Sequence, residues 1–378
     1  MNRSRPISAF SLIELLLCLA AFVLLLALVL PAIARGRALS RTEVSLNNLI
    51  ALGVAHATYA ADWNGRQFTN VVDDLSWYGD NESEAYQNYE NYHGEDHPAV
   101  LLGWGCREDG SGCGLWGYWM DMSGNWGMCQ PMVWPGGPAH LEAFGVFRIP
   151  NAKPFHDYVA GRFYEPTFYA PNDTVPYGLV EPFFDSPYEF VVGDNPTQLP
   201  YLSSYCFSPA AMFKPAVMAH PGPNPLDGWH NPWDLYAGFE SPGFYHTLYP
   251  DLKTQIIEHH WNQNAPADPC NPNWEDGTYE GCEPYYFNHA LVSEPATLFY
   301  DLSARLLPNS EVLAADEWMI NQVGYGLWSR DTPLGEDGYF IDLGYDGTPL
   351  SHHILTTDGI LGRDTLPEGF SASTRGTK

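Results

Sequence analysis

An uncharged, apolar segment near the N-terminus constrains this chain more than any other feature. From Leu15 to Ile33 no residue carries a charge. A helix rises about 1.5 Å per residue, so a helix of this length spans about 28 Å, close to the thickness of the bilayer core. The segment predicts one membrane-spanning helix at about residues 12–33. Glu14 lies at its entrance, where burying a carboxylate in lipid costs a few kcal/mol, so this residue needs a partner or a purpose.

The residues around Glu14 form a short motif. Arg3 and Arg5 make a basic leader, Ala9 and Phe10 follow, and Glu14 comes just before the apolar run. This arrangement resembles the prepilin-type cleavage and methylation motif of type IV pilins and type II secretion pseudopilins.

The resemblance implies a route of processing and assembly. A prepilin peptidase would cut between Ala9 and Phe10, residues 1–9 would leave as a leader, and the new amine would be methylated. In a fibre, the Glu14 carboxylate would lie near the Phe10 ammonium of a neighbouring subunit, which offsets the cost of a buried charge. Pro31 falls where pilins commonly carry a helix-kinking proline. Ala9 departs from the Gly that the family prefers, which leaves the efficiency of cleavage open.

Two other readings explain part of the same segment. A secretory signal peptide has an apolar core of about 7–15 residues before an Ala-x-Ala-like site, and Ala32-Ile33-Ala34 offers such a site. The segment could also be an uncleaved anchor. Neither reading explains a glutamate at the entrance of the apolar run. The positive-inside rule does not favour a head outside the cytoplasm, because more arginines follow the helix than precede it. These are Arg35, Arg37 and Arg41 after it, against Arg3 and Arg5 before it. We give the motif more weight than this count.

The helix is expected to continue well beyond the membrane, from Phe10 to about Ala60. In its second half, small and apolar residues recur at spacings of three and four, which is typical of a helix that packs on a sheet. They are Leu46, Leu49, Ile50, Gly53, Val54 and Ala57. The expected organisation is a leader at 1–9, a pilin-type helix at 10–62 and an exported globular head at 63–378.

The end of this helix carries a second resemblance. The runs Ser45-Leu46-Asn47-Asn48-Leu49 and Tyr59-Ala60-Ala61-Asp62-Trp63-Asn64-Gly65-Arg66 resemble the "NNL … Y … D-x-N-G" stretch of large pseudopilin-G-like bacterial proteins. Many members have Cys at the position of Ser45, so no thiol chemistry carries over there. Gly65 is suited to the left-handed cap that ends a helix.

The composition is strongly acidic. The chain has 45 Asp plus Glu against 17 Lys plus Arg, a net charge of −28. Such a charge repels nucleic acid and anionic lipid headgroups, and it attracts cations. The chain is also rich in aromatic residues (15%), with 32 prolines and 35 glycines. This composition favours strands, turns and ordered loops over a helical bundle.

Candidate sites for chemistry are few. The sequence contains no nucleotide-binding loop, serine-hydrolase elbow or zinc-protease motif. No cofactor is required by any motif, but four carboxylates on a glycine-containing stretch could bind Ca²⁺, and related pseudopilins can hold calcium in a C-terminal loop. They are Glu336, Asp337, Asp342 and Asp346. An anchored envelope enzyme is the main alternative, if His259, His260 and His353 converge with carboxylates. A sugar-binding protein is another, through Trp116, Trp119 and Trp126.

Six cysteines lie outside the apolar segment, which contains Cys18. They are Cys106, Cys113, Cys129, Cys206, Cys270 and Cys282. An exported chain can form disulfides, and six cysteines allow three bridges in 15 possible connectivities, with local pairs such as Cys106 with Cys113 and Cys270 with Cys282 as one arrangement. Spacing cannot fix the pairing, and reduced thiols remain the alternative.

The fold class that these features predict is α+β, with a long N-terminal helix on an antiparallel sheet and large loop-rich insertions. We expect strands at Ala296–Tyr300 and Ser310–Ala315, and a short helix at Leu252–Trp261. The expected function is structural: a subunit of a type II secretion or type IV pilus-like assembly, not an enzyme. Its expected partners are other pilin-like subunits, the prepilin peptidase and the bacterial inner membrane. The chain would cross that membrane once, with the head outside the cytoplasm or in a fibre.

Overall fold

The computed structural model describes a long helix, most of a five-stranded sheet and the segments that pack around them. The described residues are 12–68, 77–80, 84, 87–88, 91–92, 100–106, 113–118, 148–150, 153–161, 165–185, 202–220, 228, 230, 235–238, 240–258, 294–329, 353 and 355–367.

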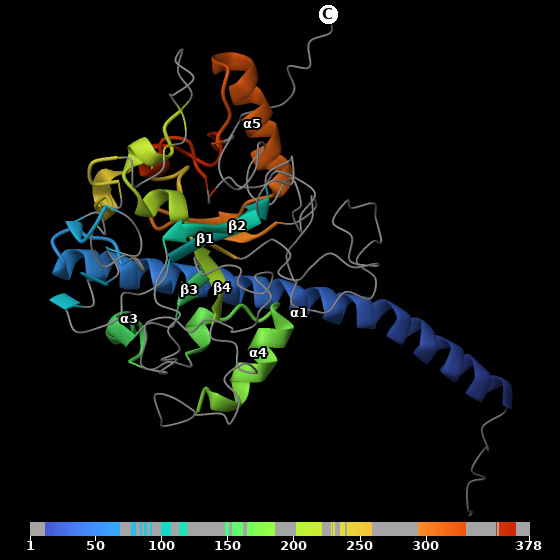
Figure 1. Ribbon diagram of the computed structural model, residues 1–378. Helices are drawn as coiled ribbons and strands as arrows, with labels where there is room; N and C mark the ends of the chain where they lie inside the picture. The colour runs from blue at the N-terminus through green and yellow to red at the C-terminus, as the bar shows by residue number, and fades with distance from the viewer. Residues whose placement is uncertain are drawn as a thin grey trace, which may run out of the picture.

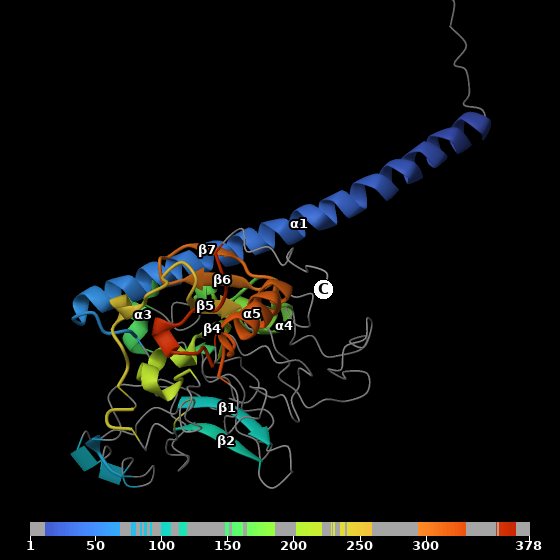
Figure 2. The same cartoon turned by 90° about the horizontal axis from the view of Figure 1, so that it is seen from above.

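The long helix α1 runs from Leu12 to Asp62, which confirms the helix expected from the sequence. It continues through Pro31 and curves gently along its length (Figures 1 and 2). The helix ends in the predicted left-handed turn, where Asn64 has φ 56° and Gly65 has φ 83°. At about 1.5 Å per residue, α1 is roughly 75 Å long, so it extends far beyond the head on its N-terminal side (Figure 1).

The main sheet has five antiparallel strands in the order β3-β4-β5-β6-β7. Their bounds are β3 Arg148–Pro150, β4 Leu202–Phe207, β5 Thr254–Glu258, β6 Ala296–Phe299 and β7 Ala304–Leu306. The second half of α1 contacts β5, β6 and β7. A separate hairpin, β1 Val100–Cys106 and β2 Cys113–Tyr118, lies on the other side of the head from α1 (Figure 2). The expected α+β architecture, a long helix on an antiparallel sheet, is therefore confirmed.

Close packing of α1 on the sheet depends on small and apolar residues. Leu49 and Leu52 are fully buried, and a Cβ at Gly53 would lie 2.8 Å from Leu298 Cδ2 of β6. The predicted stripe is correct for Leu49 and Gly53. It is wrong for Ile50 and Val54, which are exposed. The buried face of α1 is rotated relative to the predicted one. The sequence does not reveal this rotation, because no residue after Glu43 and before Asp62 is charged and could mark the solvent-facing side.

The described part of the head also contains shorter helices and several 3-10 turns. The helices are α3 Lys153–Val159, α4 Thr174–Val180 and α5 Asn309–Val323. The 3-10 turns are η2 Pro166–Phe168, η3 Glu181–Phe183, η5 Pro209–Met212, η6 Pro215–Val217, η8 Phe244–His246 and η9 Gly359–Leu361. Near the C-terminus, η9 packs on η5 and η6.

Two of the secondary-structure predictions for the head are wrong and one is confirmed. The helix predicted at Leu252–Trp261 is wrong for its middle part, Thr254–Glu258, which is strand β5. The β-branched residues of this strand fit a central position in the sheet, and all five of its residues are buried. The predicted strand at Ser310–Ala315 is part of helix α5, which has Glu311 in its first turn and ends at Gly324 with φ 87°. The strand predicted at Ala296–Tyr300 is confirmed as β6.

Candidate functional site

The N-terminal half of α1 is an apolar helix that nothing in the described part of the head covers. No α1 residue before Ser45 is buried, and large side chains such as Leu12 (75% exposed) and Leu28 (66% exposed) face outward. This part of α1 is long and apolar enough to cross a membrane. Exposing so many apolar side chains to water is unfavourable, so this half of α1 favours an apolar environment.

The structure places the predicted processing and assembly residues only in part. Glu14 lies in the first turn of α1, at the outer end of the apolar half, and Pro31 lies inside the same helix. Ala9 and Phe10 lie outside the described residues. Glu14 therefore lies near the described end of the helix, its role in assembly stays a prediction, and the cleavage site itself is not described.

A buried polar network fixes the second half of α1 to the sheet. Asn48 Nδ2 donates to the Tyr205 hydroxyl at 3.2 Å, and that hydroxyl lies 2.9 Å from Ser45 Oγ. Ser45 Oγ donates to Glu258 Oε1 of β5, and the Ala296 backbone N–H donates to Glu258 Oε2 at 2.9 Å. Burial raises the pKa of Tyr205, and the nearby carboxylate of Glu258 raises it further, so the hydroxyl keeps its proton. The network holds α1 in one register on the sheet, since hydrogen bonds require specific partners.

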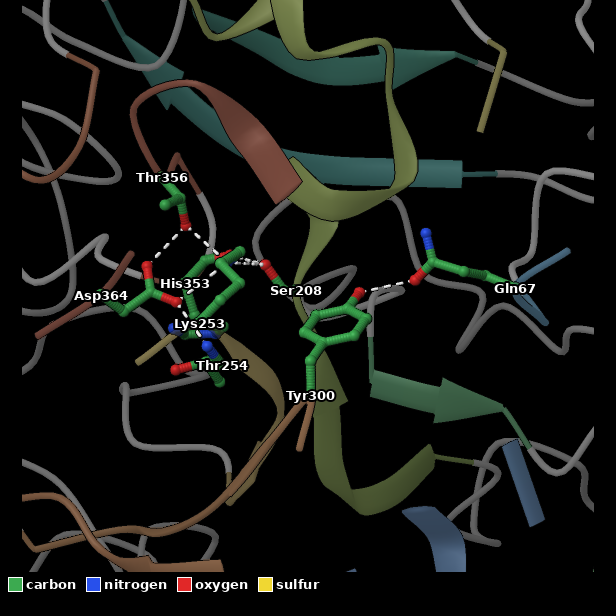
Figure 3. A network of polar contacts seen from close by, with 8 residues as sticks. All are labelled: Gln67, Ser208, Lys253, Thr254, Tyr300, His353, Thr356 and Asp364. Atoms are coloured by element: carbon green, nitrogen blue, oxygen red, sulfur yellow. Dashed lines mark hydrogen bonds and ion pairs between the residues drawn. The ribbon is translucent and has the colours of Figure 1, made fainter. Parts of the chain in front are cut away.

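A second buried network connects β5 to the C-terminal segment (Figure 3). Lys253 Nζ and Asp364 Oδ2 lie 2.9 Å apart, and both side chains are fully buried. Lys253 also donates to Ser208 Oγ at 2.7 Å and to Thr356 Oγ1 at 2.8 Å, so all three of its N–H donors can be satisfied.

The Asp364 carboxylate also has three hydrogen-bond donors. It accepts from Lys253, from the Thr254 backbone N–H at 2.9 Å and from Thr356 Oγ1 at 2.6 Å. Burial lowers the pKa of Lys253, while the negative charge of Asp364 raises it. The Lys253–Asp364 pair is therefore structural, because each of its polar side-chain atoms contacts another protein atom.

Neither network is predictable from local sequence patterns. Ser45 was singled out only for the cysteine that it replaces in the resembling proteins. Lys253 precedes a buried β-branched strand, and a cation at such a position usually needs a buried partner, which is the one signal that could have identified it. The partner, Asp364, lies far away in the sequence, so only the folded chain could reveal it.

The other predicted sites lie mostly outside the described residues. This holds for all four calcium candidates (Glu336, Asp337, Asp342, Asp346), for His259 and His260, and for Trp119 and Trp126. Trp116 lies on β2, described for its backbone only. His353 is buried, and its carbonyl oxygen accepts a hydrogen bond from Ser208 Oγ. In the described part of the chain, no three His, Cys, Asp or Glu side chains are close enough together to hold a metal ion.

The cysteines are described in part as well. Cys106 and Cys113 are directly opposite each other in the β1–β2 hairpin. Only their backbone is described, so the disulfide expected between them stays a prediction. Cys206 is a buried thiol in β4, so its expected role in a disulfide is not found. Cys129, Cys270 and Cys282 lie outside the described residues.

Comparisons of the chain with protein-family models, with curated proteins and with solved structures found no match. A long N-terminal apolar helix packed on an antiparallel sheet nevertheless fits a pilin-like fold.

Proposed function

We propose that this chain is a membrane-anchored, pilin-like structural subunit of a type II secretion or type IV pilus-like assembly. The observation that carries the proposal is the division of α1 into two halves. The first half is apolar and exposed, while the second half is fixed to the sheet by close packing and a buried polar network. One rigid helix thus joins a lipid-compatible stalk to a folded head.

The proposed activity is assembly, not catalysis. Before assembly the stalk would anchor the subunit in the bacterial inner membrane, with the head outside the cytoplasm. After cleavage, the apolar stalks of several subunits would pack together in a fibre core, since they can leave lipid only by covering one another. The buried networks support this role, because a head that is held firmly on α1 moves with its stalk.

The proposed partners follow from the same half of α1. A prepilin peptidase would cut between Ala9 and Phe10, and the Glu14 carboxylate at the tip of the helix would pair with the Phe10 amine of a neighbouring subunit. A charge pair of this kind offsets part of the cost of placing a carboxylate in an apolar fibre core. Ca²⁺ bound by the head at 336–346 stays part of the proposal as an accessory ion.

The test is the N-terminal residue of the full chain, purified from a membrane that contains a prepilin peptidase and analysed by mass spectrometry. N-methyl-Phe10 is the expected result. An intact Met1, or an N-terminus at Arg35 after signal-peptidase cleavage, would overturn the proposal.

Two matched variants sharpen this test. Ala9→Gly restores the residue that pilin-like proteins prefer before the cut, so the processed fraction should equal or exceed that of the wild type. Ala34→Arg removes the only Ala-x-Ala site near the end of the apolar run and should leave processing unchanged. If Ala34→Arg blocks cleavage, the segment is a signal peptide.

A further inference from the structure

The turn that ends α1 carries an exposed aromatic ring that the assembly function does not use. The turn comprises Asp62 to Arg66 and lies at the end of α1 opposite to the apolar stalk (Figure 1). Trp63 in this turn is 51% exposed. About half of the side-chain surface is therefore open to a ligand, and covering an aromatic ring on binding is favourable.

The Trp63 ring is held in one orientation. It stacks on Tyr59 with a centroid distance of 5.7 Å and an interplanar angle of 21°. Its Nε1–H donates to the Tyr158 hydroxyl at 3.1 Å, and that hydroxyl donates to Asp62 Oδ2 at 3.2 Å. The only polar atom of the indole is therefore already satisfied, so the part of the ring that faces water is apolar surface.

The backbone beneath the ring is fixed as well. Asn64 and Gly65 adopt left-handed conformations, and Arg66 forms an antiparallel bridge with Gly243. The Phe244 backbone N–H donates to the Gly65 carbonyl oxygen at 2.7 Å. A ring on such a turn is preorganised, which reduces the entropy lost when a ligand binds.

The turn that carries Trp63 also carries exposed polar side chains, and a second aromatic ring lies against its Gly65. Asp62, Asn64 and Arg66 are exposed on the same turn, and together they offer both acceptors and donors of hydrogen bonds. Tyr245 is 65% exposed, and its ring reaches the turn, with Cδ2 3.9 Å from the position of a Cβ on Gly65. The turn therefore combines apolar ring faces with a rim of hydrogen-bonding groups.

We propose that this turn, with Trp63 as its platform, binds an uncharged polysaccharide. A pyranose ring has a face of C–H groups that can cover an indole, and a rim of hydroxyls that suits the carboxylate of Asp62 and the amide of Asn64. The net charge of −28 repels acidic polysaccharides, and the turn itself exposes one acidic and one basic side chain, Asp62 and Arg66. The turn therefore selects for neither sign of charge, and the ligand class is neutral. This binding is independent of fibre assembly, because it needs only the folded head.

The test is affinity electrophoresis of the full chain in a nonionic detergent, in native gels that contain dextran, galactomannan or hydroxyethyl cellulose. The acidic protein migrates toward the anode, and binding to an immobile neutral polymer slows it. We expect at least one neutral polymer to retard the wild type, and alginate, an acidic polymer, to leave it unretarded.

Variants assign the retardation to the turn. Trp63→Ala should weaken binding about tenfold, and Trp63→Phe, which keeps a ring face, should weaken it less. Trp318→Ala removes a partly exposed tryptophan on α5 and should bind as the wild type does. If Trp63→Ala loses the native circular dichroism spectrum, Asp62→Ala is the test variant in its place, because it keeps the Trp63 ring and changes only a hydrogen-bonding group of the turn.

Three outcomes would overturn the proposal. The first is a wild type that none of the three neutral polymers retards. The second is a Trp63→Ala variant that folds and binds as tightly as the wild type. The third is a Trp318→Ala variant that loses binding while the variants of the turn keep it.

Discussion

Asp364→Asn is the substitution that should destabilise the head most for the smallest change in shape. The wild-type carboxylate accepts hydrogen bonds from Lys253, from the Thr254 backbone and from Thr356. An asparagine has nearly the same size but no negative charge. The substitution leaves the Lys253 ammonium fully buried without a counter-ion, which is the costly part of breaking a buried ion pair.

The expected loss of stability follows from the two states open to Lys253 in the variant, charged without a partner or neutral. Breaking a buried pair on one side costs about 3–5 kcal/mol. The lysine can avoid an unpaired charge by losing its proton, and its ordinary pKa is 10.5. Deprotonation at pH 7 costs about 5 kcal/mol, at ~1.4 kcal/mol per pH unit. The two routes give similar values, so a loss of about 4 kcal/mol in the free energy of unfolding is expected.

The pH dependence identifies the cause. If Lys253 is neutral in the folded variant but protonated in its unfolded chain, the unfolded state binds more protons, so the stability of the variant rises with pH. The difference from the wild type should therefore shrink by about 2–3 kcal/mol between pH 7 and pH 9. Lys253→Met combined with Asp364→Leu removes both charges and should be less destabilising than Asp364→Asn alone, because apolar pairs replace buried ion pairs well.

The assay is urea unfolding of the full chain in detergent, followed by far-UV circular dichroism at pH 7, 8 and 9. The control is Glu311→Gln, which breaks the partly exposed pair between Arg305 and Glu311 at 3.0 Å and should cost about 1 kcal/mol or less. A loss below about 1 kcal/mol for Asp364→Asn, or a loss that does not change with pH, would refute the reasoning.

Three further predictions concern α1. Gly53→Val should lower the free energy of unfolding by about 2–3 kcal/mol in urea titrations, because its Cβ would lie 2.8 Å from Leu298 inside a packed core. An unchanged urea midpoint would show that the core repacks around the added atoms without cost. Burial lowers the pKa of His56, outside the apolar segment, to about 3, so the unfolded chain takes up a proton below pH 6.5 that the folded one does not. The wild type should therefore lose about 2 kcal/mol relative to His56→Leu between pH 6.5 and 4.5, and parallel pH profiles for the two proteins would contradict this. Glu14→Ala should still insert into the membrane but join fibres poorly, Glu14→Asp should join them better, and incorporation of Glu14→Ala at the wild-type level in a fibre assay would exclude a pairing role.

Local patterns in the sequence were enough for several features. The run from Leu15 to Ile33 predicts a membrane-length helix because burying apolar surface needs no specific partner. The left-handed turn at Gly65 was predictable for a similar reason, since a backbone conformation of this kind favours glycine. Strand β6 was also visible as a short run of apolar residues.

Other features depended on contacts between distant segments. Within the helix predicted at Leu252–Trp261, Thr254–Glu258 is a strand because β4 and β6 pair with it on both edges, and a short apolar run does not reveal its neighbours. The predicted strand at Ser310–Ala315 is helical because the helical pattern continues beyond these residues to the capping Gly324. The orientation of α1 was misjudged at Ile50 and Val54, since a helix without charges gives no sign of its outer face.

The sequence alone determined that this chain has an apolar, membrane-length helix with a glutamate at its entrance, because charge and hydropathy are properties of consecutive residues. Only the tertiary structure decided which face of α1 meets the sheet. It also brought Lys253 to Asp364, Ser45 to Glu258, and Trp63 to Tyr158. These pairs are far apart in the chain, and the physical reason for each is the burial or alignment of polar atoms that only a folded backbone can bring together.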